Sequence, residues 1–173
     1  GKSVAAIGAA SPSAKKIVRA MPNLAAAIGA GATALYAPTE VGAGERGLAE
    51  TLMRAVGDVV WVDSEDAIDA ATAVSGSGPA YFFLLAEALA EAGRAVGLDQ
   101  SAALVLARAT LTGAGAYAAA DVRSLADLRR AVASPGGTTD AALKILDGDD
   151  QAIRMLVKNA VAAAKKRAGE LTG

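Results

Sequence analysis

The chain has 173 residues, of which 53% are hydrophobic but only 3% aromatic, and 17 basic against 18 acidic residues give a formal net charge of −1. This balance gives no electrostatic footprint for nucleic acid or an anionic membrane, so neither is expected as a partner. Because the sequence has no Cys and no His, it excludes disulfides, thiol chemistry, His-based acid–base catalysis and most transition-metal sites, and it is compatible with a reducing cytoplasm.

The first part of the chain alternates short apolar runs with one helical pattern. Four runs that are apolar or rich in β-forming residues predict strands, at residues 4–7, 16–21, 32–36 and 59–62. Within residues 43–56, apolar side chains recur at helical spacing up to Gly57, a plausible helix stop. The alternation predicts an α/β domain over residues 1–62.

From Asp63 onward the sequence carries no further strand signal. Its periodicity predicts consecutive helices at residues 64–74, 79–96, 99–120, 124–133, 139–146 and 150–168. The apolar run at residues 81–90 is interrupted by Glu87, which favours a buried helix over a membrane span. The predicted fold class is therefore mainly α with a smaller α/β part, with a second domain over residues 63–173.

Two of the predicted helices, at residues 79–96 and 99–120, are apolar nearly all round. A domain of this size can hardly bury two such helices by itself. The sequence therefore predicts a large hydrophobic interface between subunits, formed through residues 79–120.

Three stretches rich in Gly, Ser or Thr, or ending in Pro-Asn, lie next to helix starts or strand ends, at residues 19–23, 74–81 and 134–139. The third of them is the most informative. In that stretch Pro135 fixes one φ angle, Gly136 and Gly137 permit positive φ, and a predicted helix follows. A helix N-terminus offers unpaired N–H groups and partial positive charge, which suit a carboxylate or phosphate. A plain helix–helix turn with a Thr cap is the alternative interpretation of the same residues.

Together the three stretches match one protein family. They read, in chain order, Arg19-Ala20-Met21-Pro22-Asn23, then Val74-Ser75-Gly76-Ser77-Gly78-Pro79-Ala80-Tyr81, then Ser134-Pro135-Gly136-Gly137-Thr138-Thr139. From about Ile17 to its C-terminus the chain resembles Δ1-pyrroline-5-carboxylate reductase, the last enzyme of proline biosynthesis. The resemblance implies a cytoplasmic oxidoreductase with a Rossmann-type NAD(P)H domain and an all-helical domain that intertwines with a second copy into a homodimer, often part of a ring of dimers.

The resemblance also implies roles for individual residues. The carboxylate of a cyclic imino acid would be held by the third stretch, at Ser134, Gly136, Gly137, Thr138 and Thr139. Thr139 would lie near the imine nitrogen and is the candidate catalytic residue. The candidate cofactor-binding residues are Met21, Pro22 and Asn23 at the nicotinamide end, with Ser75 and Gly76 at the domain junction. The implied reaction is hydride transfer from nicotinamide C4 to the C=N carbon, which gives proline.

One departure from the family pattern concerns the phosphates of the cofactor. The family places a G-x-G-x-x-[GA] fingerprint after its first strand, and this chain has none in a strand–turn–helix context. The run Gly42-Ala43-Gly44-Glu45-Arg46-Gly47 has the spacing but is interpreted as a helix start. Residues 1–62 are therefore expected to be the second half of a Rossmann-type domain.

Two functions stay open on the sequence. One is an NAD(P)H-dependent reductase, and the other is a non-catalytic helical fragment for dimerisation and anion binding that has lost cofactor binding. The acidic run at Asp147, Asp149 and Asp150 lacks the alternating ligands and terminal Glu of a calcium loop, so no metal site is expected.

Overall fold

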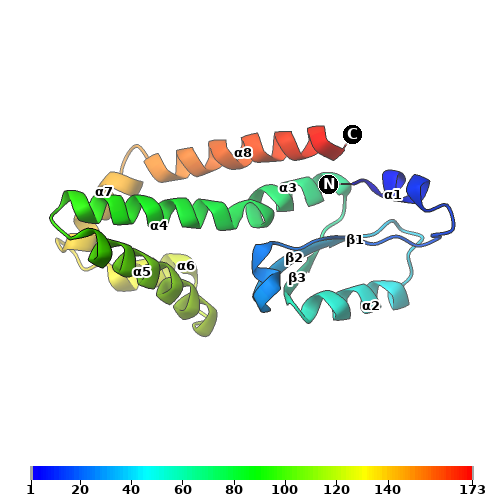
Figure 1. Cartoon of the computed structure of the whole chain (residues 1–173), viewed down its shortest axis with the longest axis horizontal. Helices are drawn as coiled ribbons and strands as arrows, with labels where there is room; N and C mark the ends of the chain where they lie inside the picture. Colours follow the sequence, from blue (N-terminus) through cyan, green and yellow to red (C-terminus); the bar gives the residue numbers. More distant parts are fainter. Residues whose placement is uncertain (1, 173) are drawn as a thin grey trace. The chain divides into compact units, whose positions relative to one another are not determined.

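The computed structural model describes residues 2–172, and within them the chain divides into two units (Figure 1). The mixed unit runs up to Ala80 and takes in the chain from Asn159 onward, and the helical unit is Tyr81–Lys158. The chain is mainly helical with one small sheet, which confirms the predicted fold class. These units differ from the predicted domains 1–62 and 63–173, whose boundary stays a prediction.

The sheet of the mixed unit has the strand order β1-β2-β3. Its strands are β1 (Arg19–Met21), β2 (Gly31–Tyr36) and β3 (Gly57–Trp61). β2 runs antiparallel to β1 and parallel to β3, and helix α2 (Ala43–Arg54) makes the crossover between the parallel pair. The central strand carries buried side chains such as Thr33, Ala34 and Leu35, so the core of this unit lies on β2. Three of the four predicted strands and the predicted helix are thus confirmed.

The first predicted strand is wrong, because residues 4–7 belong to helix α1 (Val4–Ala10). Ser3 caps this helix, its Oγ accepting a hydrogen bond from the Ala6 amide at 3.1 Å. The segment is rich in Ala, the best helix former, and a short apolar run does not by itself distinguish a strand from a helix. A 3₁₀ turn, η1 (Leu24–Ile28), follows β1 and was not predicted.

An ion pair with a buried arginine joins β1 to α3 (Glu65–Ala71). Arg19, only 7% exposed, donates to Glu65 Oε1 at 2.7 Å, and the Val4 amide donates to the same oxygen at 2.9 Å. The first residue of the reductase-like motif is therefore engaged in holding α1, β1 and α3 together.

Between the helices predicted at residues 64–74 and 79–96, the chain forms a π-helical turn. α3 begins at the Ser64 cap and continues into η2 (Thr72–Gly76), where the Ser77 amide donates to the Thr72 carbonyl at 2.8 Å. Helix α4 (Gly78–Ala95) follows, with Pro79 in its first turn, where no amide donor is needed. π-turns inside helices often mark functional positions.

The later helices match the predicted pattern. They are α5 (Gln100–Ala120), α6 (Leu125–Val132), α7 (Thr138–Asp147) and α8 (Ala152–Thr172), the last longer than expected. The Asp99 carboxylate accepts the amides of Ser101 and Ala102, and Ser124 caps α6 by accepting the Asp127 amide. Among the described residues, the buried apolar cluster of the helical unit consists of Ala90, Ala103 and Ala107.

Of the described helices, α5 is long and apolar enough to cross a membrane by length and composition. One such helix is weak evidence for a membrane span, because a helix that packs within a protein passes the same test.

The pairing of β2 with β3 depends on two glycines that face each other. Gly57 is in register with Gly31, has φ +146°, and a Cβ added to it would lie 2.0 Å from the Gly31 carbonyl oxygen. We therefore expect Gly57→Ala to lower the free energy of unfolding by at least about 2 kcal/mol, measured by urea denaturation.

The matched control is Gly47→Ala in α2, where an added Cβ meets nothing within 4 Å. This change is expected to stabilise the chain by up to about 1 kcal/mol, because Ala is the better helix former. Equal effects of the two substitutions would contradict the described register.

Candidate functional site

The stretch from Ser134 to Thr139 forms a tight turn between α6 and α7. The Gly137 amide donates to the Ser134 carbonyl at 3.0 Å, and Gly136 has φ +72°. Pro at the second position and Gly with positive φ at the third are typical of a type II turn. Gly136 is favoured by its positive φ, and a Cβ on Gly137 would lie 3.1 Å from the Ser134 carbonyl oxygen and would displace the Ser134 hydroxyl.

The turn leaves the N-terminus of α7 open. Gly137 is the N-cap and supplies no capping side chain, and the first helical bond runs from the Ala141 amide to the Gly137 carbonyl. Within the part of the chain that the structure describes, the amides of Thr138 and Thr139 have no acceptor. The two hydroxyls and two free amides are donors at the positive end of the helix dipole, an arrangement that favours an anion.

A carboxylate of the chain itself lies beside these donors. Asp140 Oδ2 accepts the Gly136 amide at 3.1 Å and pairs with Lys144 Nζ at 3.0 Å, one helical turn further on. Lys144, and to a smaller extent the Gly136 amide, hold the pKa of the Asp140 carboxyl below its usual value. Sequence reasoning missed this residue as a site residue, although its i,i+4 spacing to Lys144 is a recognisable signal.

At its other end, α7 is held by an ion-pair cluster. Asp147 receives hydrogen bonds from Arg129 of α6 and from Arg154 of α8, whose Nη2 lies 2.7 Å from Asp147 Oδ2. Its side chain is 12% exposed, and Arg154 and then Arg129 lower the pKa of its carboxyl. The cluster ties α6, α7 and α8 together at the base of the helix pair that presents the turn. No sequence pattern links these three residues.

The predicted cofactor-binding residues lie in the mixed unit. Met21 ends β1, and its Cε lies 3.0 Å from where a Cβ of Gly76 would be, so these two residues meet. Asn23 Oδ1 accepts the Ala32 amide at 3.2 Å, and Ser75 Oγ donates to the Ala71 carbonyl at 2.9 Å inside the π-turn. Pro22 is exposed beside them.

The predicted site residues therefore fall into two groups, one in each unit. The turn from Ser134 to Thr139 belongs to the helical unit, whereas Met21, Asn23 and Gly76 belong to the mixed unit. The roles of both groups stay predictions from the sequence.

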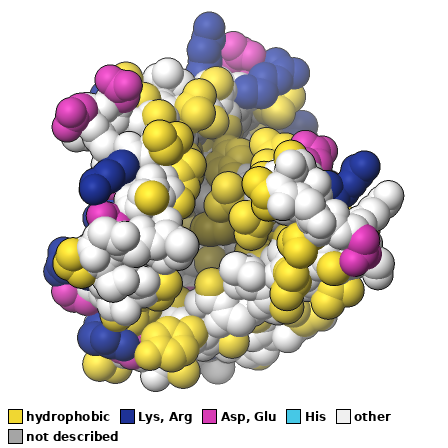
Figure 2. All heavy atoms as spheres, turned by 90° about the vertical axis from the view of Figure 1, so that its left-hand side faces the viewer, with side chains coloured by type: hydrophobic (Ala, Val, Ile, Leu, Met, Phe, Trp, Pro, Cys, Tyr) yellow, Lys and Arg dark blue, Asp and Glu magenta, His cyan; other side chains and the backbone are white. Residues whose placement is uncertain are grey.

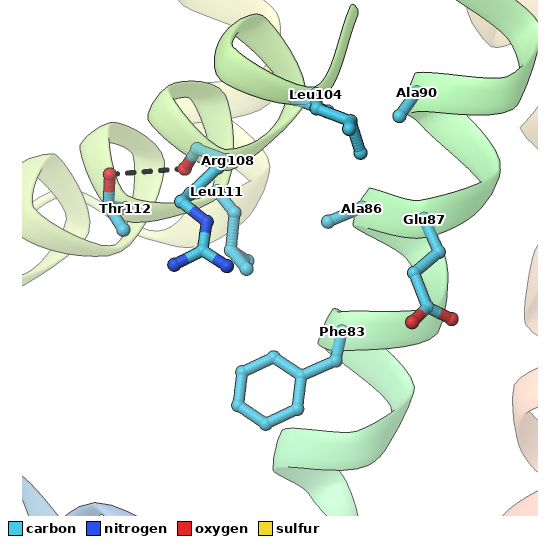
Figure 3. Close-up of a pocket in the computed structure, with 9 residues that line it drawn as sticks. Phe83, Ala86, Glu87, Ala90, Leu104, Arg108, Leu111 and Thr112 are labelled. Atoms are coloured by element: carbon cyan, nitrogen blue, oxygen red, sulfur yellow. Dashed lines mark hydrogen bonds between the residues drawn. The ribbon is translucent and has the colours of Figure 1, made fainter. Parts of the chain in front are cut away.

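An apolar groove of about 600 Å³ runs between α4 and α5. In Figure 3, Phe83, Ala86 and Ala90 project from α4 toward α5, and Leu104 and Leu111 project from α5 into the same space. Figure 2, which views the side where α4 to α7 lie, shows hydrophobic side chains gathered around a hollow. Phe83 and Leu104 are 50% and 53% exposed, so this groove is a large apolar surface open to solvent.

Comparison with known proteins points to one family. The family model described as pyrroline-5-carboxylate reductase dimerisation matches residues 65–171. The pyrroline-5-carboxylate reductase of Pseudomonas aeruginosa is 45% identical over 157 residues, which are 91% of this chain and 57% of that protein. That of Haemophilus influenzae is 38% identical over 172 residues, 99% of this chain and 63% of the relative.

Solved structures agree with these matches. A pyrroline-5-carboxylate reductase from Coxiella burnetii superposes with a TM-score of 0.91 at 44% identity, covering 100% of this chain and 63% of that one. The Plasmodium falciparum pyrroline carboxylate reductase, solved with NADP bound, gives a TM-score of 0.81 at 27% identity and coverages of 99% and 67%. The chain thus spans 57% and 63% of the length of the two curated relatives named above.

The Asp147 cluster gives the stability of the chain a defined pH dependence. The pKa of the Asp147 carboxyl is lowered in the folded state. Its contribution to the free energy of unfolding is therefore present above the unfolded carboxyl pKa of about 4 and is lost as pH falls through the folded-state value. We expect Asp147→Asn to destabilise the chain at pH 7 and the difference from the parent to shrink at acidic pH, measured by urea denaturation from pH 7 to pH 3.

The control is Asp149→Asn, because Asp149 has no ion pair among the residues that the structure describes. It is expected to change stability little at any pH. A difference between Asp147→Asn and the parent that is constant with pH would show that the carboxylate charge contributes nothing.

Proposed function

The chain belongs to the pyrroline-5-carboxylate reductase family, and from this membership we propose that it forms the dimerisation and substrate-binding part of an enzyme that reduces 1-pyrroline-5-carboxylate to L-proline in the cytoplasm with NAD(P)H. The observation that carries the proposal is the open N-terminus of α7 behind its type II turn. This end offers amides and hydroxyls to a carboxylate, and the acid in its first turn, Asp140, is already paired with Lys144.

In the proposed site the substrate carboxylate lies over the first turn of α7. The amides of Thr138 and Thr139 donate to it, and the hydroxyl of Ser134 lies beside Gly137, the N-cap of α7. Gly137 contributes mainly by shaping the turn, since its amide already donates to the Ser134 carbonyl, whereas the Gly136 amide donates to Asp140 of α7 and becomes available to the substrate when Asp140 leaves it. The Thr139 hydroxyl holds the imine nitrogen, which orients the C=N carbon for reduction.

The chemical step needs little from the side chains. When bound, the nicotinamide supplies a hydride to the C=N carbon, and the nitrogen of a protonated imine takes up the electron pair to become the secondary amine of proline. The chain binds and orients the acceptor, and no side-chain base is required if the imine is already protonated. The absence of His from the sequence is consistent with this mechanism.

The mixed unit fits one end of the cofactor better than the other. The Met21 methyl group against Gly76 offers an apolar contact of the kind that a nicotinamide ring accepts. The glycine run at the start of α2 does not suit a diphosphate, because Glu45 Oε2 lies only 2.9 Å from where a Cβ of Gly42 would be and this carboxylate, paired with Lys16, already occupies that helix end.

The same observation favours the second candidate function, a dimerisation and carboxylate-binding fragment without catalysis. The two candidates differ in one result. Turnover of NADH or NADPH with pyrroline-5-carboxylate by this 173-residue chain supports the reductase, whereas binding of L-proline without turnover supports the fragment.

We further propose a homodimer through residues 79–120. The α4–α5 groove and its exposed Phe and Leu side chains form the kind of surface that an obligate partner covers. The match to a dimerisation model over residues 65–171 supports a second copy as the occupant. The family resemblance also implies a ring of such dimers, which light scattering would detect as a multiple of the dimer mass.

The proposed role of Thr139 leads to a direct test. Replacing it by Val keeps the shape and removes the hydroxyl, so we expect L-proline to bind at least about tenfold more weakly in calorimetry, since a lost hydrogen bond to a charged group is worth about 1.5–3 kcal/mol. If the chain catalyses the reduction, kcat/KM for pyrroline-5-carboxylate falls in this variant as well.

Thr51→Val is the matched control, because among the residues that the structure describes the Thr51 hydroxyl of α2 donates only to the Gly47 carbonyl of its own helix. It should leave L-proline binding unchanged. Unaltered binding in Thr139→Val would refute the assignment of the Thr139 hydroxyl to the ring nitrogen of the ligand.

A further inference from the structure

Asp140 holds an unusual place among the helix caps of the helical unit. At the start of α6, Ser124 is the N-cap and Asp127, the third helical residue, makes a reciprocal contact with it. α7 also has an acid as its third residue, but its N-cap is Gly137. The Asp140 carboxylate therefore reaches past the cap and accepts the amide of Gly136.

This contact places a carboxylate of the chain where the proposed substrate carboxylate is to bind. The Gly136 amide belongs to the turn, immediately before the free donors of Thr138 and Thr139. Asp140 thus already engages one donor of the turn, and its negative charge lies within the same first helical turn. Two like charges this close repel each other.

We propose that Asp140 limits the affinity of the turn for carboxylates, by holding the Gly136 amide and by opposing a second negative charge. The inference rests on the proposed function of the turn. Asp140 is a positioning residue, since it acts on a bound carboxylate through Gly136 and through its charge. Binding then displaces the Asp140 carboxylate from the Gly136 amide while its pairing with Lys144 is kept.

Lys144 lowers the free-energy cost of moving the Asp140 carboxylate away from the Gly136 amide. Its Nζ lies 3.0 Å from Asp140 Oδ2, the oxygen that also accepts the Gly136 amide, and the pair has i,i+4 spacing on α7. Asp140 therefore keeps a charged partner after it leaves Gly136. Without Asp140, the same lysine becomes an unpaired positive charge one turn below the donors, which attracts a carboxylate.

The direction in which ligand affinity changes when Asp140 is removed distinguishes this inference from a purely structural role of Asp140. If Asp140 only anchors the turn, its removal disorders the donors and weakens binding. If it limits affinity, its removal strengthens binding. Asp140→Ala removes both the charge and the acceptor, whereas Asp140→Asn removes the charge and keeps an acceptor for the Gly136 amide.

The experiment measures cyclopentanecarboxylate and L-proline binding by calorimetry at low salt. Cyclopentanecarboxylate has the ring and the carboxylate without the positively charged nitrogen, so it reports the repulsion most directly. We expect Asp140→Ala to bind it about three- to tenfold more tightly than the parent, and Asp140→Asn to fall between the two. The gain should shrink at high salt, which screens charge and leaves an anchoring role unchanged.

Asp127→Asn is the matched control, because it removes the same charge from the third position of α6. It should leave the affinity for both ligands within twofold of the parent. In nitrogen-15 NMR spectra, the Gly136 amide signal of the parent should shift when either ligand is added, as it exchanges one carboxylate for another.

The outcomes distinguish the inference from the function on which it rests. If the parent binds L-proline but Asp140→Ala binds neither ligand more tightly, Asp140 is only an anchor and the inference fails while the proposed function stands. If neither the parent nor any variant binds L-proline, the carboxylate site itself is refuted, and the inference with it.

Discussion

The constraint on which the rest of the structure depends is that the helical unit buries few of its own large apolar side chains. Its buried apolar cluster is made of Ala90, Ala103 and Ala107, while Phe83 and Leu104 stay exposed along the α4–α5 groove. Contacts among small residues bury little area and contribute correspondingly little to stability. We infer that a second copy supplies the missing burial, so that folding of this unit and pairing are coupled.

The α6–α7 turn is held in place by contacts within the same helical unit. Asp147 binds arginines from two neighbouring helices, and this ion-pair cluster holds the base of α7 while the type II turn shapes its beginning. The donors of Thr138 and Thr139 are then fixed by helix geometry rather than by a flexible loop. A site of this kind holds and orients a small anion, and leaves the chemistry to a hydride donor.

Much of this architecture can be predicted from the sequence, because local sequence patterns determine it. Helical periodicity, Ser and Asp caps and the Pro-Gly-Gly turn predict α5, α6, α7 and the position of the candidate site. The apolar run at residues 4–7 predicts a strand wrongly, because helix and strand share that signal and the Ser3 cap decides between them. The contacts of Asp140 with Gly136 and of Asp147 with Arg129 and Arg154 depend on geometry around the turn and on tertiary packing. The pairing of Arg19 with Glu65 joins residues far apart in sequence for the same reason.

The most direct test of the coupling between folding and pairing is the urea midpoint of the chain, followed by circular dichroism over a hundredfold range of protein concentration. If a second copy completes the helical unit, the midpoint rises with concentration and light scattering gives at least the dimer mass. A midpoint independent of concentration, together with the mass of a folded monomer, would contradict the account.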